Sequence, residues 1–167
     1  SGPNAMVRDC IVGKDTTINA SQVNESTIGS YTTVGPFTYV RPNCRIGDHC
    51  RVGDFVEVKN SVIGDGTKIS HLTYVGDSDV GQRVNFGCGT VTTNYDGHKK
   101  HRCTIGDDVF LGCNTNLIAP VTVEDRAYTA AGSTVTDDVP EGALAIARQR
   151  QTNIRGWADR LRKTWKK

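Results

Sequence analysis

Aliphatic residues recur at every sixth position along most of this chain, and a glycine often follows them. A period of six differs from the period of about 3.6 residues of an α-helix and from the two-residue period of a simple strand. The period slips by one residue twice and is interrupted once before it resumes. The recurring residues are Ile28, Val34, Val40, Ile46, Val52, Val58, Ile63, Ile69, Val75, Val80 and Phe86, followed by Ile105, Leu111, Leu117, Val123, Thr129 and Val135.

This period predicts a chain that winds as a three-sided coil. Each side carries a short strand with one aliphatic side chain pointing inward, and glycine supplies conformational freedom at the corners. Three sides make a coil of about eighteen residues, and successive coils stack at the strand spacing of about 4.8 Å. About six or seven such coils fit between Val12 and Val135. The predicted fold class is therefore all-β, a parallel β-helix of hexapeptide repeats.

A stacked aliphatic column also explains how a chain with only 7% aromatic residues can fold. Each fully buried branched aliphatic side chain contributes about 1.5–3 kcal/mol. The column therefore replaces the aromatic bulk of a conventional core.

The pattern divides the chain into three parts. Residues 1–5 precede Met6 and are interpreted as an expression scar. Residues 6–139 form the predicted β-helix, which is interrupted at about 92–103 by a polar insertion rich in basic side chains. Residues 140–167 form a basic tail in which Trp157, Leu161 and Trp165 make an apolar stripe on a short helix. This helix is expected to cap the open end of the prism or to pack on a neighbour.

Composition excludes several classes of protein. The net charge of +2 does not favour a nucleic-acid partner, and no apolar run is long enough for a membrane span. The six cysteines lack the C-x2-C spacing of a zinc ribbon, and no secretory signal segment is present. We interpret them as reduced thiols of a cytoplasmic protein.

His71 is the first candidate for chemistry, because it lies two residues past the inward Ile69 on an outer position. A neutral imidazole is suited to removing a proton from an amine. Glu57 flanks the inward Val58, and its carboxylate could orient the His71 ring or accept a hydrogen bond from a sugar hydroxyl.

Arg41 and Lys59 are eighteen residues apart, which is one full coil. They are therefore expected to stack about 4.8 Å apart. Two cations at that distance repel unless an anion lies between them, and a phosphate would suit both. The alternative is a pair of solvated cations.

Two other functions remain open at this level. A non-catalytic solenoid scaffold would need only the repeat. A three-histidine zinc site, as in γ-class carbonic anhydrases, could draw on His49, His98 and His101, although the cations beside the last two oppose metal binding. We expect no metal in this part of the chain.

Several specific motifs lie along nearly the whole chain. They are Gly35-Pro36-Phe37, Arg41-Pro42, Gly53-Asp54, Glu57-Val58-Lys59, His71-Leu72-Thr73-Tyr74, Gly76-Asp77, Asn94-Tyr95-Asp96-Gly97 and Ala119-Pro120-Val121-Thr122-Val123. Together they resemble the acetyltransferase half of bifunctional N-acetylglucosamine-1-phosphate uridyltransferase/glucosamine-1-phosphate acetyltransferase, the GlmU family. That resemblance implies a left-handed β-helix, acetyl-coenzyme A as acetyl donor, and a homotrimer with active sites between prisms.

The resemblance also implies a role for individual residues. His71 would be the general base. Residues that would bind the sugar phosphate are Arg41, Lys59, Tyr74, Asn85 and Lys100, the last of these from the loop of a neighbouring subunit. Residues that would line the coenzyme A site are Cys88, Asn94, Tyr95, Cys113, Ala131 and Arg148.

The chain departs from one common version of the family pattern at two positions, where Cys88 and Cys113 replace alanine and serine. A nucleophilic role for Cys88 is a minor alternative, because no base partner is evident in the sequence. The glycine-rich nucleotide loop of the uridyltransferase half is also missing, so we expect an excised C-terminal domain without magnesium or UTP chemistry.

The sequence therefore predicts acetyl transfer from acetyl-coenzyme A to the amine of glucosamine-1-phosphate. The product would be N-acetylglucosamine-1-phosphate. The alternatives are a hexapeptide acyltransferase for a different amino acceptor and a non-catalytic trimeric scaffold.

Overall fold

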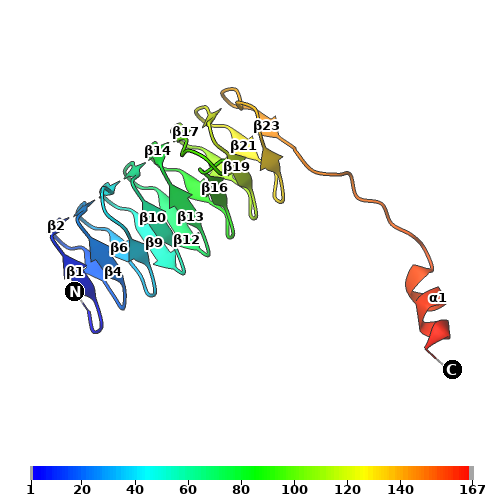
Figure 1. Ribbon diagram of the computed structural model, residues 1–167, viewed down its shortest axis with the longest axis horizontal. Coiled ribbons are helices and arrows are strands. Elements are labelled where there is room, and N and C mark those ends of the chain that lie inside the picture. Colours follow the sequence, from blue (N-terminus) through cyan, green and yellow to red (C-terminus); the bar gives the residue numbers. More distant parts are fainter. Residues whose placement is uncertain (1, 166–167) are drawn as a thin grey trace.

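The computed structural model describes residues 2–165, and within them the chain winds as a long parallel β-helix with three faces (Figure 1). Sheet A contains β1 (Met6–Arg8), β4 (Gln22–Asn24), β7 (Tyr39–Val40), β10 (Glu57–Lys59), β13 (Tyr74–Gly76), β16 (Val91–Thr93), β19 (Asn116–Ile118) and β22 (Thr134–Val135). Sheet B contains β2 (Ile11–Val12), β5 (Thr27–Ile28), β8 (Arg45–Ile46), β11 (Val62–Ile63), β14 (Ser78–Val80), β17 (Cys103–Ile105) and β20 (Val121–Val123). Sheet C contains β3 (Thr17–Ile18), β6 (Thr33–Val34), β9 (Arg51–Asp54), β12 (Lys68–His71), β15 (Asn85–Phe86), β18 (Phe110–Leu111), β21 (Tyr128–Thr129) and β23 (Leu144–Ala145).

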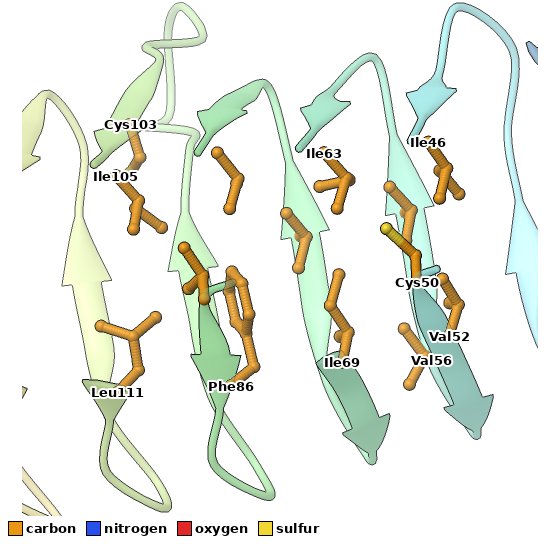
Figure 2. Packing of buried hydrophobic residues seen from close by; sticks show 14 of the residues in the cluster. Ile46, Cys50, Val52, Val56, Ile63, Ile69, Phe86, Cys103, Ile105 and Leu111 are labelled. Carbon is orange, nitrogen blue, oxygen red and sulfur yellow. The ribbon is translucent and has the colours of Figure 1, made fainter. Parts of the chain in front are cut away.

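The aliphatic repeat sets the register of these sheets. In sheet A, Val40 pairs with Val58 and Val58 pairs with Val75. Every one of the recurring residues from Ile28 to Val135 is buried, and the largest are fully enclosed (Figure 2). The predicted inward positions are therefore confirmed. The slips in the period correspond to coils that are one residue shorter, as between Val58 and Val75.

Short polar side chains fill the corners inside the coils. The Ser26 hydroxyl donates to the Arg41 carbonyl at 2.9 Å and accepts from the Cys44 N–H at 3.1 Å, so it ties successive coils together. Thiols occupy equivalent places, since Cys50 donates to the Gly64 carbonyl at 3.2 Å. Burial raises the pKa of the Cys103 thiol to about 11. These inner cysteines are packing residues.

Glycine serves a different purpose from the one expected. Corner residues with positive φ include Tyr31, Phe55 and Leu72, which are not glycines. The glycine after an inward residue instead permits close approach of the next coil. A Cβ on Gly64 would lie 2.5 Å from the backbone of Gly81.

The insertion lies between β16 and β17, and its two sides are joined by an antiparallel bridge between Tyr95 and Lys100. The β-helix continues beyond the predicted boundary at residue 139, because the Ala130 N–H donates to the Ala145 carbonyl and holds β23 against β21. At the other end, the predicted scar packs on the first coils through the Gly2 N–H and the Ile18 carbonyl. Residues 1 and 166–167 of the predicted scar and tail lie outside the described residues.

The predicted C-terminal helix is present as α1 (Trp157–Thr164), but it does not cap the prism. Residues 146–156 lead away from the last coil, and α1 stands apart at their end (Figure 1). Its apolar stripe is uncovered, and Trp157 is 54% exposed. The capping prediction was wrong because the chain leaves the end of the prism after β23. Within residues 2–165, no helix is long and apolar enough to cross a membrane.

The buried column predicts a large effect of a single truncation. We expect Ile69→Ala, at a fully buried position, to lower the free energy of unfolding by about 2–5 kcal/mol. Urea denaturation followed by circular dichroism measures the change. Val62→Ala, on the outer face of sheet B at a 44% exposed position, is the matched control and should change stability by no more than about 0.5 kcal/mol. Equal effects of the two substitutions would contradict the inward assignment.

Candidate active site

Five positions line up along the edge where the chain passes from sheet C to sheet A. Each lies two residues past the buried residue of its sheet C strand, and the strand pairings carry this register from coil to coil. We call this set the corner column. It consists of Asp54, His71, Cys88, Cys113 and Ala131.

His71 and Asp54 are hydrogen-bonded within this column. Their residues are paired in register, and His71 Nδ1 lies 2.9 Å from Asp54 Oδ1. The bond from His71 lowers the pKa of the Asp54 carboxyl, so this group is ionised at neutral pH. With Nδ1–H donated to the carboxylate, Nε2 is the nitrogen that can take up a proton. The imidazole is 54% exposed, so an acceptor amine can reach it.

Orienting the His71 ring was one of two roles predicted for Glu57, and the structure gives that role to Asp54. Glu57 Oε1 instead accepts from Arg41 Nη1 at 2.9 Å. Asp54 lies seventeen residues before His71, which is one of the shorter coils. That spacing is the signal in the sequence that could have identified it.

Arg41 and Lys59 stack in adjacent coils as predicted, since the register of β7 with β10 continues one residue past Val40 and Val58. Each cation has its own carboxylate. Arg41 binds Glu57, and Lys59 Nζ lies 3.2 and 3.3 Å from the oxygens of Asp77. The repulsion argued from the sequence is therefore relieved within the chain, and it does not by itself require a phosphate.

No role was predicted for Asp77 from the sequence, although it holds Lys59 in the group of Arg41, Lys59 and Lys100, which we call the cation cluster. Asp77 is only 4% exposed, and its oxygens accept from Lys59 Nζ and from the amides of Asn60 and Asn94, both at 2.6 Å. Burial alone would raise its pKa, but the hydrogen bonds from Asn60, Lys59 and Asn94 lower it overall. Asp77 is therefore a buried anion that fixes Lys59 in place.

Tyr74 and Lys100 complete this group. Tyr74 Oη lies 3.3 Å from Asn94 Nδ2, so the Asn94 side chain faces the cation cluster rather than the corner column. The insertion brings Lys100 close to Lys59 within the same chain, and the neighbouring Lys59 amine lowers the pKa of Lys100. Asp77 is bound directly by Lys59.

The insertion itself is held by polar contacts. Asp96 accepts from the backbone N–H groups of His98 and Lys99 at 2.7 Å and from His101 Nε2 at 2.7 Å. Arg102 binds Asp79 through two nitrogens at 2.6 and 3.0 Å and also donates to the Asn60 carbonyl.

The other predicted residues lie in different places. Asn85 is half-buried on sheet C, and Ala131 is exposed. A Cβ on Gly132 would lie 3.8 Å from Arg148 Cδ, so Arg148 reaches the far end of the column. Tyr95 is exposed on the insertion and donates to the Gly97 carbonyl. His71 occupies the column position one coil before Cys88, so a base does lie near that thiol, contrary to the sequence analysis.

One chain does not bring all the predicted residues together. His71 lies at the edge where the chain enters the strands of sheet A, whereas Arg41 and Lys59 lie at the edge where the chain leaves them. A groove of about 740 Å³ lies on the outer face of sheet A, between His71 and the two cations. Leu72 lines one side of the groove, and Glu57 and Tyr74 line its floor.

The histidines proposed for zinc are also dispersed. His49 stacks on Tyr31 with ring centroids 4.9 Å apart, while His101 is bound to Asp96. Among residues 2–165, no three side chains of the metal-binding types gather at one place.

The insertion gives a prediction about pH. Hydrogen bonds within the insertion, of which the bond from His101 has the largest effect, lower the pKa of Asp96 from an ordinary value of 3.8 to about 2. Because the pKa of this carboxyl is lowered, the ordered loop has its full stabilisation at pH values above 3.8. It loses that stabilisation as the pH falls towards about 2. We expect the protection factors of the His98 and Lys99 amides, measured by hydrogen exchange relative to the intrinsic rate at each pH, to fall over this range.

Asp96→Ala should give fast exchange of these amides already at pH 7 and should remove the dependence on acid pH. Asp9→Ala, at an exposed position on the first coil, is the control. Unchanged protection of His98 and Lys99 in Asp96→Ala would show that this carboxylate does not hold the loop.

Comparison with known proteins places this geometry in a family. The bacterial transferase hexapeptide model, which covers six repeats, matches residues 25–60 and 102–137. Bifunctional protein GlmU of Oceanobacillus iheyensis is 62% identical over 162 residues, and that of Clostridium acetobutylicum is 57% identical over 158 residues. The alignments cover 97% and 95% of this chain but only 36% and 35% of the relatives, so the chain spans about a third of their length.

Solved structures agree on the fold. PerB from Caulobacter crescentus, in complex with CoA and GDP-perosamine, has a TM-score of 0.62 at 26% identity over 70% of this chain and 54% of that chain. UDP-N-acetylglucosamine acyltransferase from Campylobacter jejuni has a TM-score of 0.60 at 17% identity over 98% of this chain and 82% of that chain. The predicted left-handed β-helix is confirmed. The chain therefore carries bacterial transferase hexapeptide repeats over residues 25–60 and 102–137, and its resemblance to the GlmU family is confirmed over nearly its whole length.

Proposed function

We propose that this chain transfers an acetyl group from acetyl-coenzyme A to the amine of glucosamine-1-phosphate. The product, N-acetylglucosamine-1-phosphate, would be used to make UDP-N-acetylglucosamine. The observation that carries the proposal is the His71–Asp54 pair at the head of a column of small residues. The similarity to GlmU proteins and to a CoA-bound acetyltransferase supports it.

The proposed chemistry is a direct transfer. His71 Nε2 takes a proton from the substrate ammonium, and Asp54 stabilises the imidazolium that forms. The freed amine attacks the thioester carbonyl, and the backbone N–H of Cys88, at the next column position, donates to the oxyanion. Coenzyme A then leaves as the thiol. The rest of the cofactor would extend past Cys113 and Ala131 towards Arg148.

The cation cluster is the proposed site for the substrate phosphate. Arg41, Lys59 and Lys100 can each donate to phosphate oxygens, and a phosphate would relieve the repulsion that lowers the pKa of Lys100. Phosphate binding should therefore raise the pKa of Lys100. The phosphate has to share Arg41 with Glu57, which sets the geometry of the contact.

A complete site requires more than one chain under this proposal. His71 lies on one edge of sheet A and the cation cluster lies on the other. A neighbouring prism that presents its cation cluster beside His71 would bring base and phosphate site together. We therefore propose a homotrimer with sites between prisms, located in the cytoplasm, where the six unpaired cysteines of this chain would stay reduced. Uridyltransferase chemistry would belong to parts of the full-length protein outside this sequence.

The role of His71 can be tested directly. We expect His71→Ala to lower turnover by about 10²- to 10⁴-fold, because it removes the general base. Free-thiol release from acetyl-coenzyme A in the presence of glucosamine-1-phosphate measures the rate. Size-exclusion chromatography with light scattering should show an unchanged assembly.

Asp54→Asn is the companion variant, because it keeps the shape of the side chain but removes its charge. It should lose less turnover than His71→Ala while leaving the Michaelis constant for acetyl-coenzyme A nearly unchanged. Full turnover in His71→Ala would remove this residue from the mechanism.

A rival function follows from the carboxylates on the cations. Because Glu57 and Asp77 already neutralise Arg41 and Lys59, an acyltransferase for an amino acceptor without a phosphate would also fit. Under our proposal, Arg41→Ala should raise the Michaelis constant for glucosamine-1-phosphate by about 10- to 100-fold. That ratio corresponds to the free energy of one charge-assisted hydrogen bond. Steady-state kinetics with glucosamine-1-phosphate measure this constant. Arg45→Ala, an exposed residue of sheet B, is the matched control. An unchanged Michaelis constant in Arg41→Ala would favour the rival acceptor.

A further inference from the structure

Two of the six cysteines differ from the rest. Cys88 is half-buried and Cys113 is exposed, and both lie in the corner column. The remaining cysteines face the interior or hydrogen-bond to backbone carbonyls near their own coil, which gives them packing roles. These are Cys10, Cys44, Cys50 and Cys103.

The strand pairing places Cys88 and Cys113 directly above one another. Phe86 pairs with Leu111, and the Asn114 N–H donates to the Cys88 carbonyl at 2.8 Å, so the register continues through both cysteines. Successive coils are about 4.8 Å apart. A disulfide requires a separation of about 4.4–6.8 Å between Cα atoms, so the backbone spacing suits one.

The same column shows that side chains in successive coils can meet there. His71 and Asp54 occupy the equivalent positions of two neighbouring coils, and their side chains touch at 2.9 Å. His71 is also the column residue before Cys88, so an imidazole lies one coil from that thiol. Thiolate is the species that attacks a disulfide, and a neighbouring imidazole can accept its proton.

We propose that Cys88 and Cys113 form a reversible intramolecular disulfide when the protein meets a low-molecular-weight disulfide. The Cys88 thiolate attacks one sulfur of the reagent, forms a mixed disulfide and releases one thiolate. The Cys113 thiolate then attacks Cys88 Sγ, forms the Cys88–Cys113 bond and releases the second thiolate. Two protein thiols are oxidised, one reagent disulfide is reduced to two thiols, and the protons pass to the solvent.

The consequence for activity rests on the proposed function. The cross-link would lie between His71 and Ala131, along the path proposed for the thioester arm of acetyl-coenzyme A. It would also close the coil that carries the insertion with Lys100. The oxidised protein is therefore inactive in acetyl transfer until a thiol reductant reopens the column.

The test uses oxidised glutathione as the probe and intact-mass spectrometry as the first measurement, which is independent of activity. After incubation and removal of the reagent, the protein should lose the mass of two hydrogen atoms. Proteolysis without reduction should yield a linked peptide pair containing Cys88 and Cys113. Dithiothreitol should restore the original mass.

The second measurement is the rate of free-thiol release before and after oxidation of the same sample. The unsubstituted protein and Cys10→Ser should both lose most of this rate on oxidation and recover it with dithiothreitol. The double variant Cys88→Ala/Cys113→Ser should show the same rate before and after oxidation, whatever that rate is.

Retention of six free thiols, or stable glutathione adducts at Cys88 or Cys113 without the linked pair, would overturn the disulfide. A linked pair that leaves the rate unchanged would overturn the blocked cofactor path while leaving the disulfide in place. Absence of acetyl transfer before oxidation would overturn the proposed function, and the mass measurement would still decide the disulfide.

Discussion

The stacking of coils in strict register is the constraint on which the rest of this molecule depends. Backbone hydrogen bonds between coils fix the position of each side chain relative to those one coil away, so residues about seventeen or eighteen apart become neighbours. The His71–Asp54 pair and the Arg41–Lys59 stack both arise in this way. Coils of seventeen and of eighteen residues keep the same register, because the buried aliphatic column aligns each strand with the strand one coil away.

Electrostatics then divides the surface of sheet A into two edges with different properties. At one edge, an exposed imidazole and its carboxylate are open to the solvent. At the other edge, buried Asp77 holds Lys59 and Asn94, and the insertion adds Lys100. Loop order and the cation cluster are linked, because the insertion that carries Lys100 is itself fastened by Asp96 and Arg102. A carboxylate that anchors the loop therefore also affects the charge available for an anionic substrate.

The sequence predicted the coil, the inward residues and the insertion, because each depends on a period that local composition reveals. It did not predict the partners of the functional residues. Glu57 seemed suited to His71, yet a strand alternates its side chains and the short coil between positions 54 and 71 brings Asp54 into that place instead. Asp77 looked like one of many corner aspartates, and its importance appears only with its burial. The position of α1 depends on the path of residues 146–156, for which the repeat gives no information.

The residues that follow the corner column explain why chemistry belongs to one part of a regular prism. Each column residue is followed by a corner residue with positive φ, and after Asp54 and His71 these are the large apolar residues Phe55 and Leu72. In the coils beyond that of His71 they become Gly89, Asn114 and Gly132. Large apolar side chains beside the column therefore end at the coil that carries the imidazole, and smaller residues that fill less of the space beside the column follow. An extended cofactor needs such space on one side of the base only, so the change from Leu72 to Gly89 gives the column a direction in which the proposed thioester arm can lie.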